Sequence, residues 1–233
     1  MSGIAIVLEN ADFSQKNIGQ VNFITDVPVT GIDITGEPSA GDPEITLGIA
    51  YTPIGTSQRG VNWAVTSGAA TINQSGVLTP NAFVNTNVVV SAVSKFNPNV
   101  YATKSIAFSY ENLTPSWTLG FYTRTGPFNN VGDGRYYTIV GGLSLSSDYQ
   151  ISCEEGFWFR LRYYSGTPST STIISSSQMI TSCRVSEEAP ANATIVTINI
   201  SYDDVSGPTS GTIMSQEDVA RLNEIVTITR LNK

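Results

Sequence analysis

Histidine is absent from this chain of 233 residues, and charged side chains are scarce. Without an imidazole, a Ser-His-Asp triad, a Cys-His dyad and a histidine general base are all excluded. Only 13% of the residues are charged, about half of the usual share. Serine, threonine, asparagine and glycine take their place, which is typical of extracellular and virion β-proteins.

The charge balance and the short apolar runs limit the partners. The net charge is −7, whereas nucleic-acid binding needs a concentrated basic surface, so we expect no nucleic-acid partner. The early apolar run, residues 4–8, is far shorter than the roughly 20 residues that cross a bilayer, so we expect no membrane insertion. No basic residue precedes this run and Glu9 follows it, so it does not resemble a secretory leader.

The two cysteines, Cys153 and Cys183, do not form a metal-binding pattern, because C-x-x-C spacing and histidine are both missing. We expect them to be buried small hydrophobic residues rather than a disulfide, since a chain without a leader is expected in a reducing compartment. Either role would be structural.

The most frequent pattern in the sequence is the alternation of apolar and polar residues with a period of two. Apolar residues alternate with polar ones in "GIDIT", "EITLGIAY" and "VNWAV", and turn signals separate these runs. This pattern over residues 29–110 predicts an antiparallel β-sandwich. Val61, Trp63 and Val65 share a face, and Trp63 is predicted to fill the core.

The same residues resemble the group 2 bacterial immunoglobulin-like domains. An opening strand is followed by "L-x-x-x-Y-x-P", "V-x-W", "A-T-I-N-x-x-G-x-L-T" and "V-x-A-x-S", in the order of that family. The resemblance covers about a third of the chain. It implies an Ig-like fold and a spacer or adhesive role on bacterial or phage surfaces, and it implies neither a catalytic residue nor a cofactor.

The rest of the chain predicts a second, jelly-roll-like β-sandwich with one short helix. "GFWFRLRYYSG" and "ATIVTINISY" are its strongest strands, and Ser215 with Asp218 forms a variant capping box before "VARLNE". We therefore expect an all-β protein with three parts. They are an N-terminal anchoring segment (1–28), an Ig-like domain (29–111) and a C-terminal β-sandwich (112–233).

One strand of the second domain suggests an interaction surface. In "FWFRLRYY" one face carries core residues, and the other carries Trp158, Arg160, Arg162 and Tyr164. Trp, Tyr and Arg are enriched at interface hot spots, and they also suit stacking on sugar rings. We predict a subunit interface ahead of a ligand site. The alternative is that a neighbouring loop covers Trp158 and Tyr164 while the arginines pair with local carboxylates.

Carboxylate pairs are the remaining option for catalysis, as in glycoside hydrolysis. The pairs are Glu154-Glu155, Glu187-Glu188 and Asp203-Asp204. Neighbours on a strand point to opposite faces, and charged loop residues are usually solvated. A D-x-D-x-D-G calcium loop is also missing. We therefore expect no enzymatic activity, no metal and no cofactor.

A short motif near the start bears on function. Residues 11–21, "ADFSQKNIGQV", resemble an N-terminal "ADFS-x-x-x-(I/L)-G-x-V" motif of phages and prophages of gut Bacteroidetes, including crAss-like phages. The hypothesis is a bacteriophage virion protein, a head fibre, capsid decoration or tail-fibre component, which assembles in the host cytoplasm. Phe13, Gly19 and Val21 would take part in anchoring it to the particle.

The expected partners follow from this hypothesis. They are other virion proteins of the capsid or tail and further copies of the chain, with a homotrimer favoured. A host-surface glycan is a candidate ligand. The alternative is a bacterial cell-surface carbohydrate-binding protein or adhesin with an Ig-like spacer, which needs an export signal.

Overall fold

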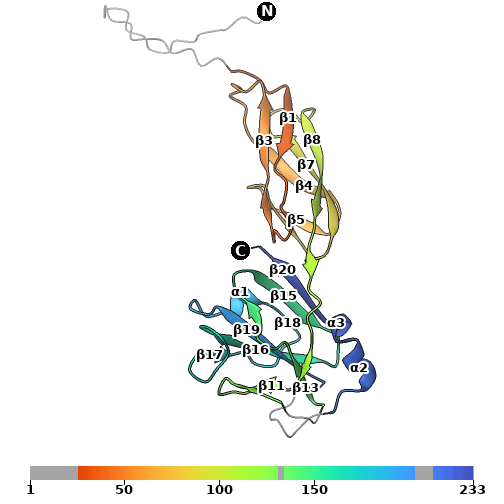
Figure 1. Cartoon of the computed structure of the whole chain (residues 1–233). Coiled ribbons are helices and arrows are strands. Elements are labelled where there is room, and N and C mark those ends of the chain that lie inside the picture. Colours follow the sequence, from red (N-terminus) through yellow and green to blue (C-terminus); the bar gives the residue numbers. More distant parts are fainter. Residues whose placement is uncertain (1–25, 131–133, 203–211, 233) are drawn as a thin grey trace, which may run out of the picture.

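The structure is a computed structural model that describes residues 26–130, 134–202 and 212–232. It confirms the predicted all-β fold class: antiparallel sheets build two sandwiches that lie end to end (Figure 1). Each sandwich has its own apolar cluster, one ending near Tyr110 and the other beginning at Leu113. No helix in the described ranges is long and apolar enough to cross a membrane.

The N-terminal sandwich forms from the alternating segments. One sheet has the order β4-β7-β8, and two smaller sheets, β1-β3 and β2-β6-β5, contribute to the same core. The bounds are β1 (Gly31–Thr35), β2 (Ile45–Thr46), β3 (Gly48–Thr52), β4 (Val61–Ser67), β5 (Ala70–Ile72), β6 (Val77–Pro80), β7 (Thr86–Ser94) and β8 (Tyr101–Phe108).

Trp63 lies in this core, as predicted. Its side chain is only 7% exposed, and Val61 beside it on β4 is also buried. The side chain of Gln74 holds the strand in place: its Oε1 accepts from the Trp63 N–H at 3.2 Å, and its Nε2 donates to the Trp63 carbonyl at 3.1 Å. The period-two pattern therefore gave the correct register here.

The C-terminal sandwich has jelly-roll topology. One sheet has the order β9-β20-β15-β18, and the other contains β13-β19-β16-β17. If these eight strands are numbered along the chain, the orders are 1-8-3-6 and 2-7-4-5, which is the jelly-roll arrangement. The bounds are β9 (Glu111–Asn112), β13 (Tyr136–Thr138), β15 (Asp148–Cys153), β16 (Trp158–Tyr164), β17 (Ile173–Ser176), β18 (Ser182–Arg184), β19 (Ile195–Ser201) and β20 (Val226–Leu231).

Short elements complete this domain. β10 (Thr118–Leu119) and β14 (Leu143–Ser144) extend the second sheet, and β11 (Phe121–Tyr122) pairs with β12 (Phe128–Asn129) as a hairpin. The helix after Ser215 is confirmed as α2 (Gln216–Ala220), because the Ser215 Oγ accepts from the Asp218 N–H at 3.0 Å. Two further short helices, α1 (Val185–Glu188) and α3 (Leu222–Ile225), were not predicted.

The segment that joins the sandwiches differs from expectation. We expected Glu111 to close the first domain. Instead Glu111 and Asn112 form β9, which pairs with β20 of the second domain. Their side chains reinforce the pairing, since Glu111 accepts from Arg230 at 2.9 Å and Asn112 from Thr229 at 2.8 Å.

Candidate functional site

The prediction that one face of β16 is an accessible interaction surface is wrong for two of the four residues on that face. Arg162 is 4% exposed and the Tyr164 side chain is fully buried. Trp158 and Arg160 are half-buried. Both faces of β16 are covered, one by the sandwich core and the other by the β11–β12 hairpin. The alternative interpretation had anticipated a cover over Tyr164, but its pairing of the arginines with carboxylates is not found for Arg160 or Arg162 among the described residues.

Hydrogen bonds from the buried face hold the hairpin in place. The Tyr122 carbonyl accepts from Arg162 Nε at 2.7 Å and from Asn199 Nδ2 at 3.0 Å. The Tyr122 N–H donates to Asn199 Oδ1 at 3.0 Å, and the Tyr164 hydroxyl donates to the Gly126 carbonyl at 2.9 Å. The alternating polar residues of β16 and β19 therefore satisfy the backbone of the hairpin rather than face solvent.

Gly126 allows the hairpin to pack this closely. Its φ of 111° is rare for residues with a Cβ, and a Cβ at this position would lie 2.2 Å from the Ser169 carbonyl oxygen. The hairpin turn and the loop after β16 thus meet through backbone atoms.

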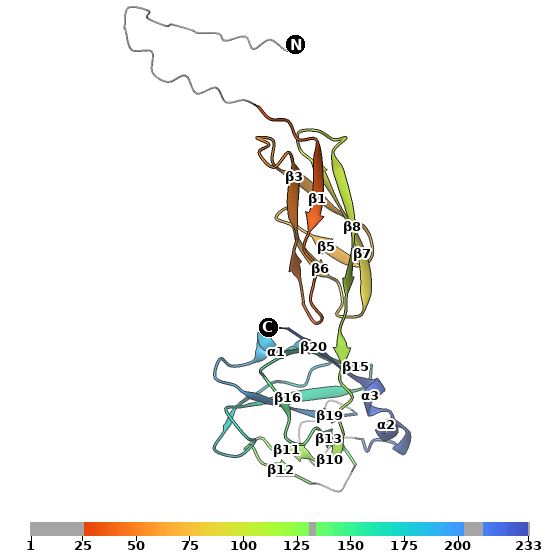
Figure 2. The same ribbon diagram turned by 45° about the horizontal axis from the view of Figure 1, so that its top comes forward.

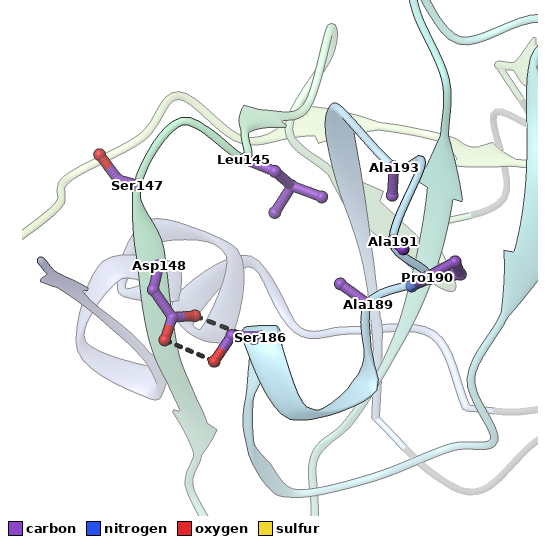
Figure 3. A pocket seen from close by; sticks show the side chains of 8 residues that line it. All are labelled: Leu145, Ser147, Asp148, Ser186, Ala189, Pro190, Ala191 and Ala193. Carbon is purple, nitrogen blue, oxygen red and sulfur yellow. Dashed lines mark hydrogen bonds between the residues drawn. The ribbon is translucent and has the colours of Figure 1, made fainter. Parts of the chain in front are cut away.

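A second polar cluster surrounds Asp148 beside a small recess of about 160 Å³ (Figure 3). The Asp148 side chain is 1% exposed and accepts from Arg184 Nε at 2.7 Å, from the Ser186 N–H at 2.9 Å and from the Ser186 Oγ at 2.7 Å. Burial alone would raise the pKa of Asp148, but the hydrogen bonds from Ser186 and Arg184 outweigh it and lower this pKa.

The Asp148 cluster fastens α1 to the sheet. Asp148 begins β15, Arg184 ends β18 and Ser186 lies in α1, so one carboxylate joins three elements. Apolar or small side chains provide most of the remaining lining of the recess: Leu145, Ala189, Pro190, Ala191 and Ala193 (Figure 3). The carboxylate accepts its hydrogen bonds from Tyr149, Arg184 and Ser186, so it acts as a structural tie.

The cysteines are both free and half-buried. Burial raises the pKa of Cys153 to about 11. Burial, assisted by the charges of nearby carboxylates, raises that of Cys183 to about 12. Thiols with such pKa values are poor nucleophiles at neutral pH. Their position agrees with the structural role that we expected.

The two carboxylate pairs that the structure describes do not converge on one site. Glu154 is exposed and forms an ion pair with Arg221 at 2.7 Å, and Glu187 and Glu188 lie in α1. Asp203 and Asp204 lie outside the described residues, as do the predicted anchoring residues Phe13, Gly19 and Val21. Within the described ranges, no group of three or more potential ligands could hold a metal ion.

The junction between the sandwiches is a direct contact that the sequence did not indicate. Asn232 follows β20, and its N–H donates to the Gly41 carbonyl at 2.8 Å. Its side-chain Nδ2 donates to the Ala40 carbonyl at 2.8 Å and to Asp42 Oδ1 at 2.7 Å. On the same junction the Arg184 guanidinium lies 6.0 Å from the centre of the Phe83 ring.

The opposite end of the N-terminal sandwich, the distal tip, exposes three large apolar side chains. Ile54 is 86%, Phe96 55% and Tyr101 65% exposed. Ile54 lies in the loop after β3, Phe96 in the loop after β7, and Tyr101 at the start of β8. A hydrogen bond from the Lys95 N–H to the Gly60 carbonyl, at 3.0 Å, joins the two loops. Figure 2 shows the first described residues leaving the domain at this end.

No family model matches the sequence, and no curated protein matches it significantly.

Two features of these sites were missed by sequence reasoning, and a third was given only as an alternative. Asp148 stands in "SSDYQ" and Asn232 in "RLNK", and neither motif differs from an ordinary loop or strand end. The sequence gives one weak sign that β16 is covered: this strand carries large residues on both faces, as strands covered on both sides do.

Proposed function

We propose that this protein is a non-enzymatic structural component of a bacteriophage virion, a head fibre, capsid decoration or tail-fibre protein. Residues 1–28 anchor it to the particle, and the two sandwiches project outward as an Ig-like spacer and a jelly-roll head. The order of motifs in residues 29–110 and the "ADFS" motif support this proposal from the sequence side.

The observation that carries the proposal is the direction of the chain through the molecule. Asp26 and Val27 are fixed at the distal tip: the Ser57 Oγ donates to the Asp26 carboxylate, and the Thr56 Oγ1 donates to the Val27 carbonyl at 2.6 Å. The C-terminal sandwich lies at the other end (Figure 1). A partner that binds the chain just before residue 26 would lie beside the distal tip, with the jelly roll at the far end of the molecule.

The distal tip suits contact with such a partner. Its three exposed apolar residues lie next to the point where residue 26 leaves the domain, and burying apolar area is the main source of binding free energy. Its loops are ordered before binding, because Arg59 donates to the carbonyls of Ile54 and Thr56. Ordered loops lose little conformational entropy on association.

Deletion of residues 1–20 tests the proposal. The truncated protein should fold with unchanged circular dichroism and thermal unfolding, because both cores lie beyond residue 28. It should fail to incorporate into particles when it is supplied in place of the full chain during phage growth. A Val140→Ser variant of the full chain, altered at an exposed residue of the other domain, is the matched control. Normal incorporation of the truncated protein would refute the anchoring role.

A further inference from the structure

Three arginines of the C-terminal sandwich gather beside the β11–β12 hairpin. Arg160 and Arg162 lie two residues apart on one face of β16. Arg124 lies in the turn of the hairpin, between Tyr122 and Gly126, whose carbonyls accept from β16 side chains. Figure 2 shows the hairpin next to β16 and β19.

The positive charge of this cluster is not neutralised within the described residues. Arg162 is 4% exposed, and the acceptors of its hydrogen bonds are neutral: the Tyr122 carbonyl at 2.7 Å and the Ser176 Oγ at 3.0 Å. None of the three arginines forms an ion pair with a described carboxylate. Other arginines of the same domain do so, namely Arg184, Arg221 and Arg230.

An uncompensated guanidinium in such a position is unfavourable. Arginine stays protonated in proteins, and burying a charge is costly unless a counter-charge accompanies it. Burial lowers the pKa of Arg162. Tyr164 opposes this shift, while the charges of Arg160 and Arg124 add to it. The charges of Arg160 and Arg124 therefore act on the buried guanidinium group of Arg162.

One donor of the cluster also lacks an acceptor. The Nε of Arg160 is inaccessible to solvent and has no hydrogen-bond partner. Buried donors without a partner are rare in folded proteins, and an ion that completes the site is one explanation for them. Arg124 is exposed and Arg160 half-buried, so a ligand can approach from the side of the hairpin turn.

We propose that Arg124, Arg160 and Arg162 form a binding site for a single oxyanion group: a carboxylate, sulfate or phosphate of a ligand. Guanidinium groups bind these planar or tetrahedral anions through paired N–H donors. Arg160 and Arg124 contact the anion. Arg162, which is buried under the hairpin, holds the hairpin in place, and its positive charge attracts the anion without touching it. The site does not depend on the particle-anchoring role, because it lies on the other domain.

The test is isothermal titration of the full chain with D-glucuronate, with inorganic sulfate and with inorganic phosphate. Glucose serves as the neutral sugar control, and chloride holds the ionic strength constant. We expect saturable binding of at least one oxyanion, with no binding of glucose. Tighter binding of glucuronate than of sulfate and phosphate would assign the site to acidic sugars, and the reverse order would assign it to sulfated or phosphorylated ligands.

Arg124→Gln and Arg160→Gln should each weaken this binding about tenfold or more, since each removes a charge-assisted hydrogen bond. Arg230→Gln is the matched control, because the charge of Arg230 is already paired with Glu111. The affinity of this variant for the anion should equal that of the wild type. Circular dichroism of each variant reports folding separately. Absence of saturable binding by all three anions, or unchanged affinity in both cluster variants, would overturn the proposal.

Discussion

The backbone N–H of Asn232 donates to the carbonyl of Gly41 at 2.8 Å, so the end of strand β20 in one sandwich is tied to a turn of the other. Gly41 makes this approach possible. Its φ is 86°, and a Cβ there would lie 3.3 Å from both the backbone nitrogen and the side-chain oxygen of Asn232. Together with β9, this contact gives the two sandwiches two separate connections, which restrict bending.

Removing the Asn232 side chain should loosen this junction. Asn232→Ala loses the hydrogen bonds to Ala40 and Asp42, but it leaves both cores intact. Small-angle X-ray scattering should show a broader distribution of interatomic distances, while the thermal unfolding of each domain stays unchanged. Asn62→Ala, at an exposed position on β4, is the control and should scatter as the wild type does. A wild-type scattering profile for Asn232→Ala would mean that the side-chain hydrogen bonds of Asn232 do not set the domain orientation.

Trp63 should dominate the stability of the N-terminal sandwich. Trp63→Ala replaces a nearly buried side chain with a cavity, and such truncations cost about 3–5 kcal/mol. Urea unfolding followed by circular dichroism measures the loss. Tyr101→Ala, which truncates an aromatic side chain that is 65% exposed, should change stability by no more than about 0.5 kcal/mol. Equal effects of the two substitutions would contradict the register of β4.

Asp148 should make the stability of the jelly roll depend on acidic pH. Because its pKa is lowered in the folded state, the unfolded chain takes up the proton first as the pH falls. The stability that the carboxylate contributes is complete above its unfolded pKa of about 3.9 and disappears as the pH falls through the folded pKa.

Asp148→Asn isolates this contribution. At pH 7 the substitution should destabilise the protein by about 2–3 kcal/mol, since it removes charge-assisted hydrogen bonds from Arg184 and Ser186. In urea unfolding, the difference between wild type and variant should shrink when the pH is lowered from 5 toward 2. Asp33→Asn, on an exposed position of β1, controls for the general effect of removing an acid. A difference that does not change with pH would show that the ion pair is not the source of the stability.

Local patterns predicted the strands of both sandwiches, the burial of Trp63 and the Ser215 cap, because each depends on neighbours within a few residues. The face of β16 was mistaken for a surface because its cover comes from residues 121–129, about 40 positions earlier, and period-two alternation does not report what lies above a strand. The Asp148 cluster and the Asn232 contact also join distant segments. Their residue types are ordinary for loops, so the sequence carries no mark of them.

The corrected position of Tyr164 changes what its removal should do. A subunit interface on this face of β16 would let Tyr164 be removed without unfolding the monomer. Tyr164 is fully buried, and its hydroxyl donates to the Gly126 carbonyl at 2.9 Å. Tyr164→Ala alone should therefore destabilise the jelly roll by about 3–5 kcal/mol. A homotrimer stays a prediction that no longer rests on this residue.

Tyr164→Phe separates packing from hydrogen bonding at the same position. It keeps the ring beside Tyr122, whose centre lies 6.0 Å away, but it leaves the Gly126 carbonyl without this donor, at a cost of about 1–3 kcal/mol. Urea unfolding should rank the variants wild type, then Phe, then Ala, and light scattering at micromolar concentration should be run on the same samples. If Tyr164→Ala leaves the unfolding curve unchanged but lowers the molecular mass, Tyr164 lies at a subunit interface and the β11–β12 hairpin does not cover it in solution.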